Sequence, residues 1–159
     1  MRVLITGAGG FVGNHLTSYL KSAHPDATLY GTVLNDQEKA SQHITSLFQV
    51  DLKDYNHVYD ILKECQPDAI YHVAAQACVP RSFEDPWETL EKNIRSQLKL
   101  IQACLALDSR PRMLIISSAE VYGAINTAQM PMAEDTPLRP TNPYSVSKVT
   151  QDMLGLQYY

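Results

Sequence analysis

The sequence has little cysteine, with three residues among 159. Cys65, Cys78 and Cys104 are odd in number and far apart, which excludes a disulfide framework and a C-x-x-C metal site. We expect each of them to be buried as a small hydrophobic residue. The five histidines have no metal-ligand spacing either, so the sequence predicts no metal site.

Basic clusters and long apolar segments are also missing. The net charge is −4, which makes nucleic acid and anionic membranes poor candidates for a partner. The N-terminus has no basic region followed by an apolar one, so a cytoplasmic protein is expected. With 45% hydrophobic and 19% charged residues, the chain has an ordinary globular composition, and its length suggests one domain.

Strand-like and helix-like segments alternate along the chain. Apolar runs bounded by turn residues predict strands at 2–6, 28–34, 47–50, 69–74 and 112–117. Apolar residues at helical spacing predict helices at about 10–23, around 58–62, at 87–107 and from Tyr144 onward, with a loop over 123–143 before the last. This order predicts an α/β fold, a doubly wound parallel sheet of the Rossmann type, with helices on both faces.

Ligands of such a sheet bind beyond the carboxyl ends of its strands. Several residues suited to a site follow predicted strands: Gly7, Asp36, Asp51, Ala74–Ala75 and Ser117–Ser118. We therefore expect the functional site at that edge.

A glycine-rich turn follows the first predicted strand. Its spacing is Gly7-x-x-Gly10-x-x-Gly13, and Val12 stands where the ordinary G-x-G-x-x-G pattern has its last glycine. Such a turn directs backbone N–H groups and the positive end of a helix toward one point, and glycines let a pyrophosphate approach the backbone. Glycines alone also fit a plain tight turn, but the strand–turn–helix setting favours dinucleotide binding.

Tyr144 and Lys148 lie four residues apart, which places them on one face of the last predicted helix. A nearby ammonium group favours the phenolate form of a tyrosine, which suits acid–base catalysis. A surface Tyr and Lys would be the ordinary interpretation of this spacing. Here Tyr144 and Lys148 follow two serines, Ser117 and Ser118, at the end of the fifth predicted strand, in a chain that already has a glycine turn. This context favours catalysis.

With these motifs, the sequence resembles the extended short-chain dehydrogenase/reductases that modify nucleotide sugars. The resemblance covers essentially the whole chain and is carried by an ordered set of segments: 6–13, Asp51–Leu52, 72–76, Asn93, 117–123 and 143–148. It implies a homodimer or higher oligomer in the full-length protein. It also implies that residues 1–159 are a dinucleotide-binding domain incomplete at its C-terminal end, truncated before the last strands and the small substrate domain.

The resemblance assigns roles to matching positions. It implies that the glycine turn holds the cofactor pyrophosphate, that Asp51 and Leu52 line the adenine pocket, and that Ala74 and Ala75 pass along the cofactor. It also implies that Ser118 bonds the sugar oxygen being oxidised, Tyr144 takes its proton, and Lys148 holds the nicotinamide ribose. The residues expected to bind the cofactor are Gly7, Gly10, Phe11, Val12, Gly13, Asp36, Asp51, Leu52, Ala74, Ala75, Tyr144 and Lys148.

Glu120 separates the possible reactions of this family. The 4,6-dehydratases resemble this sequence in having a carboxylate there, whereas simple epimerases have a small or hydroxyl side chain. Once C4 is oxidised, a carboxylate can remove the acidified C5 proton so that water leaves from C6. Ala119, where dTDP-glucose dehydratases usually have Asp, and the segment 75–86 favour a GDP-mannose 4,6-dehydratase-like enzyme.

Other interpretations stay open at this point. Glu120 alternatively pairs with a basic neighbour at a strand end, and the chain alternatively belongs to a 4-epimerase, a 4-keto-6-deoxy-sugar reductase or a non-catalytic binding fragment. The expected cofactor is NAD(P). Asp36 after the second strand favours the free ribose hydroxyl of NAD, although Lys39 nearby opposes this preference.

Overall fold

The structure is a computed structural model that describes residues 1–127 and 130–159. It divides the chain into two compact units. The first unit contains Met1–Ala75 and Arg95–Ile115, and the second contains Gln76–Ile94 and Ile116–Tyr159. That residues 1–159 form one dinucleotide-binding domain stays a prediction.

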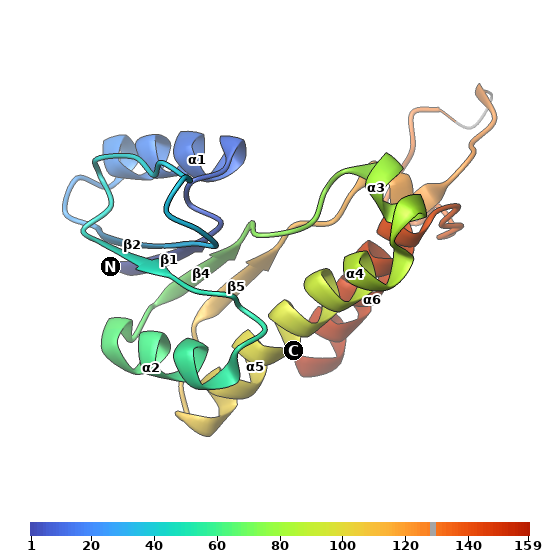
Figure 1. Cartoon of the computed structure of the whole chain (residues 1–159). Coiled ribbons are helices and arrows are strands. Elements are labelled where there is room, and N and C mark those ends of the chain that lie inside the picture. Colours follow the sequence, from blue (N-terminus) through green and yellow to red (C-terminus); the bar gives the residue numbers. More distant parts are fainter. Residues whose placement is uncertain (128–129) are drawn as a thin grey trace. The chain divides into compact units, whose positions relative to one another are not determined.

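The first unit is built on a parallel sheet of five strands (Figure 1). Along the chain the strands are β1 (Arg2–Thr6), β2 (Thr28–Val33), β3 (Ser46–Gln49), β4 (Ala69–His72) and β5 (Arg112–Ile115). Their order in the sheet is β3-β2-β1-β4-β5, with Leu4 of β1 paired between Tyr30 and Ile70. The strand order therefore reverses beside β1, and a ligand crevice is expected at such a point. This sheet confirms the predicted fold class.

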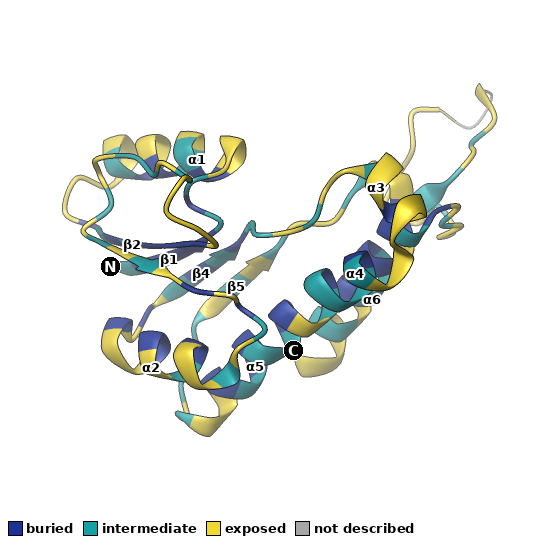
Figure 2. Cartoon of the chain, viewed as in Figure 1, coloured by how far each residue is buried: buried dark blue, intermediate teal, exposed yellow. Residues whose placement is uncertain are grey.

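Helices cover both faces of this sheet, with α1 (Phe11–Ala23) on one face and α2 (Tyr55–Cys65) and α5 (Ser96–Ala106) on the other (Figure 1). Side chains of a strand alternate between faces. Accordingly, Val3 and Ile5 join the apolar cluster that contains Leu20 of α1, whereas Leu4 joins the cluster of α2 and α5. The inner strands β1, β2 and β4 are buried or half-buried, whereas the edge strands β3 and β5 alternate between half-buried and exposed residues, as the colours of Figure 2 show.

The second unit consists of short elements around one longer helix. These are α3 (Val79–Glu84), α4 (Pro86–Leu90), most of the π-helix η1 (Glu91–Arg95), the 3₁₀ turn η2 (Ala119–Tyr122) and α6 (Pro143–Tyr158). Both α3 and α4 pack against α6. The buried side chains here are mainly polar: Ser82, Thr89, Asn93, Asn142, Ser145, Ser147, Lys148 and Gln151. Buried polar groups need hydrogen-bond partners, so this interior is held by specific bonds.

Several local predictions were wrong. The helix expected over 87–107 is divided into α4, η1 and α5, and neither α3 nor η2 was expected. Strands four and five end earlier, at His72 and Ile115. Within α1, Gly13, Thr17 and Leu20 are buried, while Phe11 and Val12 are exposed, which leaves their predicted contact with the cofactor untested. Cys78 is exposed, while the other two cysteines are buried as expected. The loop predicted over 123–143 includes residues 128–129, which lie outside the described residues.

In the part of the chain that the structure describes, no helix has both the length and the apolar character needed to span a membrane. Among the same residues, no three histidine, cysteine or acidic side chains gather into a group that could hold a metal ion.

Candidate functional site

The glycine turn of the first unit needs glycine at two positions for its own packing. Gly7 has φ +68°, and a Cβ there would lie 2.9 Å from the Cα of Ala74. A Cβ at Gly13 would overlap the carbonyl oxygen of Gly7 and lie 2.7 Å from the Cα of Ala8. These two glycines therefore let the turn, the start of α1 and the end of β4 approach closely.

Gly10 is less constrained by the packing of the fold than Gly7 and Gly13. Its φ of −75° suits any residue, and a Cβ would meet only the carbonyl oxygen of Gly7, at 3.3 Å. Gly10 is also the N-cap of α1, a 13-residue helix whose first turn has no acidic side chain and no side-chain cap. Space over an uncapped helix N-terminus fits a phosphate group. The glycine turn thus fits the pyrophosphate of a dinucleotide.

The loop after β2 packs against the glycine turn. Asn14 of α1 donates from its Nδ2 to the carbonyl oxygens of Gly9, at 3.0 Å, and Lys39, at 3.0 Å. A Cβ at Gly9 would lie 2.8 Å from the Cβ of Glu38, which shows how closely the two loops meet. Glu38 accepts a hydrogen bond from Asn35 at 3.2 Å. Sequence reasoning missed Asn14 and Glu38, since neither belongs to a recognisable spacing.

Thr6 holds the end of β4 beside the turn. Its Oγ1 accepts hydrogen bonds from the backbone N–H groups of Val73 and Ala74, both at 3.2 Å, and lies 2.9 Å from Nδ1 of His72. This side-chain acceptor replaces a strand partner, which explains why β4 ends at His72. It also fixes Ala74 next to Gly7.

The other predicted cofactor residues lie at the same edge of the first unit. Asp36, Asp51 and Ala75 are exposed, whereas Leu52 is buried in the cluster of α2 and α5. Asp51 accepts a bond from the backbone N–H of Lys53 at 3.0 Å.

In the second unit, α6 presents Tyr144 and Lys148. The helix begins at the N-cap Asn142, whose side chain and that of Ser145 form a reciprocal capping box. Tyr144 is 8% exposed and Lys148 is 4% exposed. The Lys148 ammonium donates to the carbonyl oxygen of Ile116 at 3.0 Å and lies 5.9 Å from the centre of the Tyr144 ring. Burial lowers the pKa of Lys148 to about 8.

Ser118 and Glu120 belong to the turn η2 of the same unit. The Ser118 Oγ accepts the backbone N–H of Glu120 at 3.2 Å, which leaves the hydroxyl hydrogen available to donate. The Glu120 carboxylate accepts a hydrogen bond from Nδ2 of Asn142 at 2.9 Å. The partner of Glu120 is therefore an amide at the start of α6, and not the basic neighbour of the alternative interpretation.

Asn93 is the centre of a buried network that supports α6. Its side chain accepts from the N–H of Gln76 at 2.8 Å and donates to the Ser147 hydroxyl at 2.8 Å. The backbone carbonyl oxygen of Asn93 accepts a hydrogen bond from Nε2 of Gln151 at 2.9 Å. Asn93 lies in η1, and π-helical turns are frequent at functional sites, which is a signal that only the structure gives.

The structure thus gathers the predicted residues into two groups. Ser118, Glu120, Tyr144 and Lys148 all lie in the second unit, while the glycine turn and Ala74 lie in the first.

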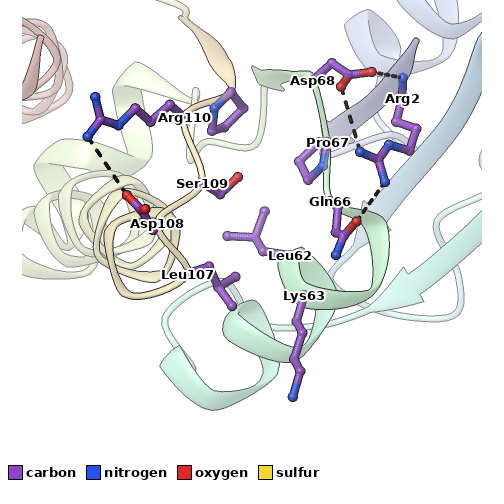
Figure 3. Close-up of a pocket in the computed structure, with 11 residues that line it drawn as sticks. Arg2, Leu62, Lys63, Gln66, Pro67, Asp68, Leu107, Asp108, Ser109 and Arg110 are labelled. Atoms are coloured by element: carbon purple, nitrogen blue, oxygen red, sulfur yellow. Dashed lines mark hydrogen bonds and ion pairs between the residues drawn. The ribbon is translucent and has the colours of Figure 1, made fainter.

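A pocket of about 490 Å³ lies elsewhere in the first unit, at the amino ends of β1, β4 and β5 (Figure 3). Its rim includes Arg2, which contacts Gln66 and Asp68, and Arg110, which lies 3.9 Å from Asp108. It contains none of the predicted site residues.

Comparisons with known proteins identify the family of this chain. The family model described as GDP-mannose 4,6 dehydratase matches residues 4–159. The GDP-6-deoxy-D-mannose reductase of Pseudomonas aeruginosa is 36% identical over 157 residues, which cover 99% of this chain and 47% of that protein.

Two solved structures are similar along nearly the whole chain. RMD from Pseudomonas aeruginosa, complexed with NADPH, is 35% identical with a TM-score of 0.81, covering 99% of this chain and 49% of that one. The UDP-glucose 4-epimerase of Thermus thermophilus, complexed with NAD, is 29% identical with a TM-score of 0.86, covering 99% and 50%. The chain spans about half the length of these relatives. Since the family model matches almost every residue of it, the chain belongs to the GDP-mannose 4,6 dehydratase family of nucleotide-sugar dehydratases and epimerases.

Proposed function

We propose that this chain provides the dinucleotide-binding and acid–base residues of a 4,6-dehydratase that acts on a GDP-sugar. One observation carries the proposal. In the second unit, the Glu120 carboxylate is hydrogen-bonded to the start of α6, the helix that presents Tyr144 and Lys148. Epimerisation at C4 needs the tyrosine and lysine. Elimination of water needs in addition a base at C5.

The cofactor of the proposed enzyme is NAD(P), and the free space over Gly10 at the start of α1 supports this. Gly7, Gly10 and Gly13 would hold its pyrophosphate, with Phe11 and Val12 exposed in the same segment. When bound, NAD(P) supplies the hydride acceptor for oxidation at C4. The acidic loop that contains Asp36 and Glu38 disfavours a 2′-phosphate, which supports NAD over NADP.

The acid–base steps fall to residues of the second unit. Ser118 would donate its hydroxyl hydrogen to the C4 oxygen, and Tyr144 would accept the proton of the C4 hydroxyl as this carbon is oxidised. Lys148, whose ammonium is held by the Ile116 carbonyl and lies 5.9 Å from the centre of the Tyr144 ring, would hold the nicotinamide ribose.

Elimination follows from the new carbonyl at C4, which acidifies the C5–H bond. Glu120 would take this proton, a C5–C6 double bond would form, and the C6 hydroxyl would leave as water after receiving a proton from the carboxylic acid. Return of the hydride to C6 and of a proton to C5 gives the 4-keto-6-deoxy sugar. The bound cofactor would supply this hydride, so the overall reaction would need no external reductant.

Glu120→Gln tests this function in a version of the protein that spans the length of its relatives. The variant keeps the shape of the side chain and loses the base. With GDP-mannose we expect reduction of the nicotinamide, followed by absorbance, but no deuterium at C5 and no 4-keto-6-deoxy product. Glu120→Asp, which retains a carboxylate, is the matched control and should keep part of the exchange.

A second candidate is a reductase or epimerase of the same family. It is favoured by the 36% identity to a reductase and by the bond from Asn142 to Glu120, which also serves a structural role. If Glu120→Gln interconverts C4 epimers at an undiminished rate, the epimerase is correct. A reductase would instead consume reduced cofactor stoichiometrically with a 4-keto-6-deoxy substrate.

A further inference from the structure

Asn142 uses both ends of its side-chain amide. Its Oδ1 accepts the backbone N–H of Ser145 at 2.7 Å, which caps the first turn of α6. Its Nδ2 donates to Oε2 of Glu120 at 2.9 Å. One buried amide therefore joins the helix that presents Tyr144 to the turn that presents Glu120.

Capping alone does not require asparagine. Aspartate and serine cap helices about as well, since a cap needs only an oxygen acceptor. Aspartate, however, has no hydrogen to donate to Glu120, whereas the amide combines an acceptor with a donor. Capping of α6 therefore does not explain the hydrogen bond from Nδ2 of Asn142 to Glu120.

We propose that Asn142 is a positioning residue for the Glu120 base, an inference that rests on the proposed dehydratase function. The hydrogen bond from Asn142 occupies Oε2 and fixes the carboxylate plane, which leaves Oε1 to take the C5 proton. Because Asn142 also caps α6, it keeps Glu120 in register with Tyr144.

Asn142→Asp separates the two roles, because it keeps the capping oxygen and removes the donor. In the version of the protein that turns over, we expect nicotinamide reduction by a GDP-sugar to stay near the wild-type rate. Deuterium exchange at C5 should fall roughly 10- to 100-fold, the effect of losing a hydrogen bond to a charged group. Asn142→Ala, which removes cap and donor together, should lower the thermal midpoint as well.

A second measurement needs no turnover. In the 159-residue chain, nuclear magnetic resonance can follow the side-chain NH₂ of Asn142 directly. Glu120→Gln should shift this resonance and speed its hydrogen exchange. The side-chain NH₂ of Asn93, whose bonds to Gln76 and Ser147 do not involve Glu120, is the internal control and should stay in place.

The outcomes separate this inference from the proposed function. If Glu120→Gln abolishes C5 exchange but Asn142→Asp does not slow it, Asn142 only caps the helix while the dehydratase stands. An unmoved Asn142 resonance in Glu120→Gln would also overturn the inference. If Glu120→Gln itself leaves C5 exchange unchanged, it is the dehydratase assignment that is wrong.

Discussion

The two units differ in how their candidate site residues are built. In the first, the turn proposed to bind the cofactor depends on the lack of side chains: Gly7 and Gly13 permit close packing, and Gly10 leaves space. In the second, the site is made of polar side chains that are present and bonded, among them Asn93, Asn142 and Lys148. Substitutions that add atoms to the glycine turn should therefore impair the first unit, whereas substitutions that remove polar atoms should impair the second.

The largest effect is expected from removing one oxygen in the second unit. Tyr144→Phe should lower the rate of hydride transfer ~10²–10⁴-fold, since general acid–base catalysis contributes about this much. Cofactor affinity, measured by calorimetry, should hardly change. A loss much smaller than tenfold would mean that another group carries the proton.

Adding one carbon to the first unit comes next. Gly13→Ala places a Cβ against the Gly7 carbonyl and 2.7 Å from the Cα of Ala8, both of them backbone atoms. Overpacking typically costs ~1–3 kcal/mol of unfolding free energy, and urea denaturation would measure it. An unchanged unfolding midpoint would show that the turn can move aside.

Gly10→Ala is the matched change with a smaller effect on the fold. Its Cβ meets one protein atom at 3.3 Å, so the unfolding midpoint should stay close to that of the wild type. The added methyl occupies the space that fits a pyrophosphate, and NAD(P) affinity should fall; Gly10→Val should abolish it. Undiminished affinity in Gly10→Val by calorimetry would contradict the assignment of this turn.

The last prediction concerns the pH dependence of stability. Lys148 has a pKa of about 8 when folded, below its ordinary 10.5, because of burial. The cost of burying its charge is fully present below pH 8 and is lost as the pH rises toward 10.5, so this group makes the fold more stable across that window.

Lys148→Met should remove this rise. Urea denaturation between about pH 7 and about pH 9.5 would show a flatter dependence in the variant than in the wild type. Burial raises the pKa of Cys65 to about 12 and of Cys104 to about 11, which makes stability fall with pH above 9. Both thiols are present in each protein, so their contribution cancels. Parallel curves would mean that the Lys148 charge is not desolvated.

The first unit was the more predictable from sequence, because apolar side chains form its interior. The strands and the buried face of α2 follow from Val58, Ile61 and Leu62 and from similar apolar residues. The helix over 87–107 was predicted from Leu90, Ile94, Leu98, Ile101 and Leu105, and of these Ile101 is buried. In the first half of the segment the buried side chains lie one position before the predicted ones, at Thr89, Asn93 and Gln97.

A pattern of apolar residues cannot find an interior made of polar ones. Tyr144 and Lys148 were identified because their spacing has a chemical meaning by itself. Asn142 was not, since its importance depends on Glu120, 22 residues earlier in the chain. The contacts of Asn14 and Glu38 with the glycine turn also depend on folding, and nothing in the local sequence marks them.

The π-helix η1 fixes the number of residues that must lie between α4 and α5. A π turn amounts to an α-helix with one inserted residue, and it separates α4, which packs on α6, from α5, which packs on α2. Deleting one residue from Glu91–Arg95 would restore a regular helix and rotate one half by about 100° relative to the other. Either Thr89 or Leu100 would then leave its buried position. An insertion or deletion between them would therefore expose a buried side chain at one end of the segment, even where it removes no buried residue itself.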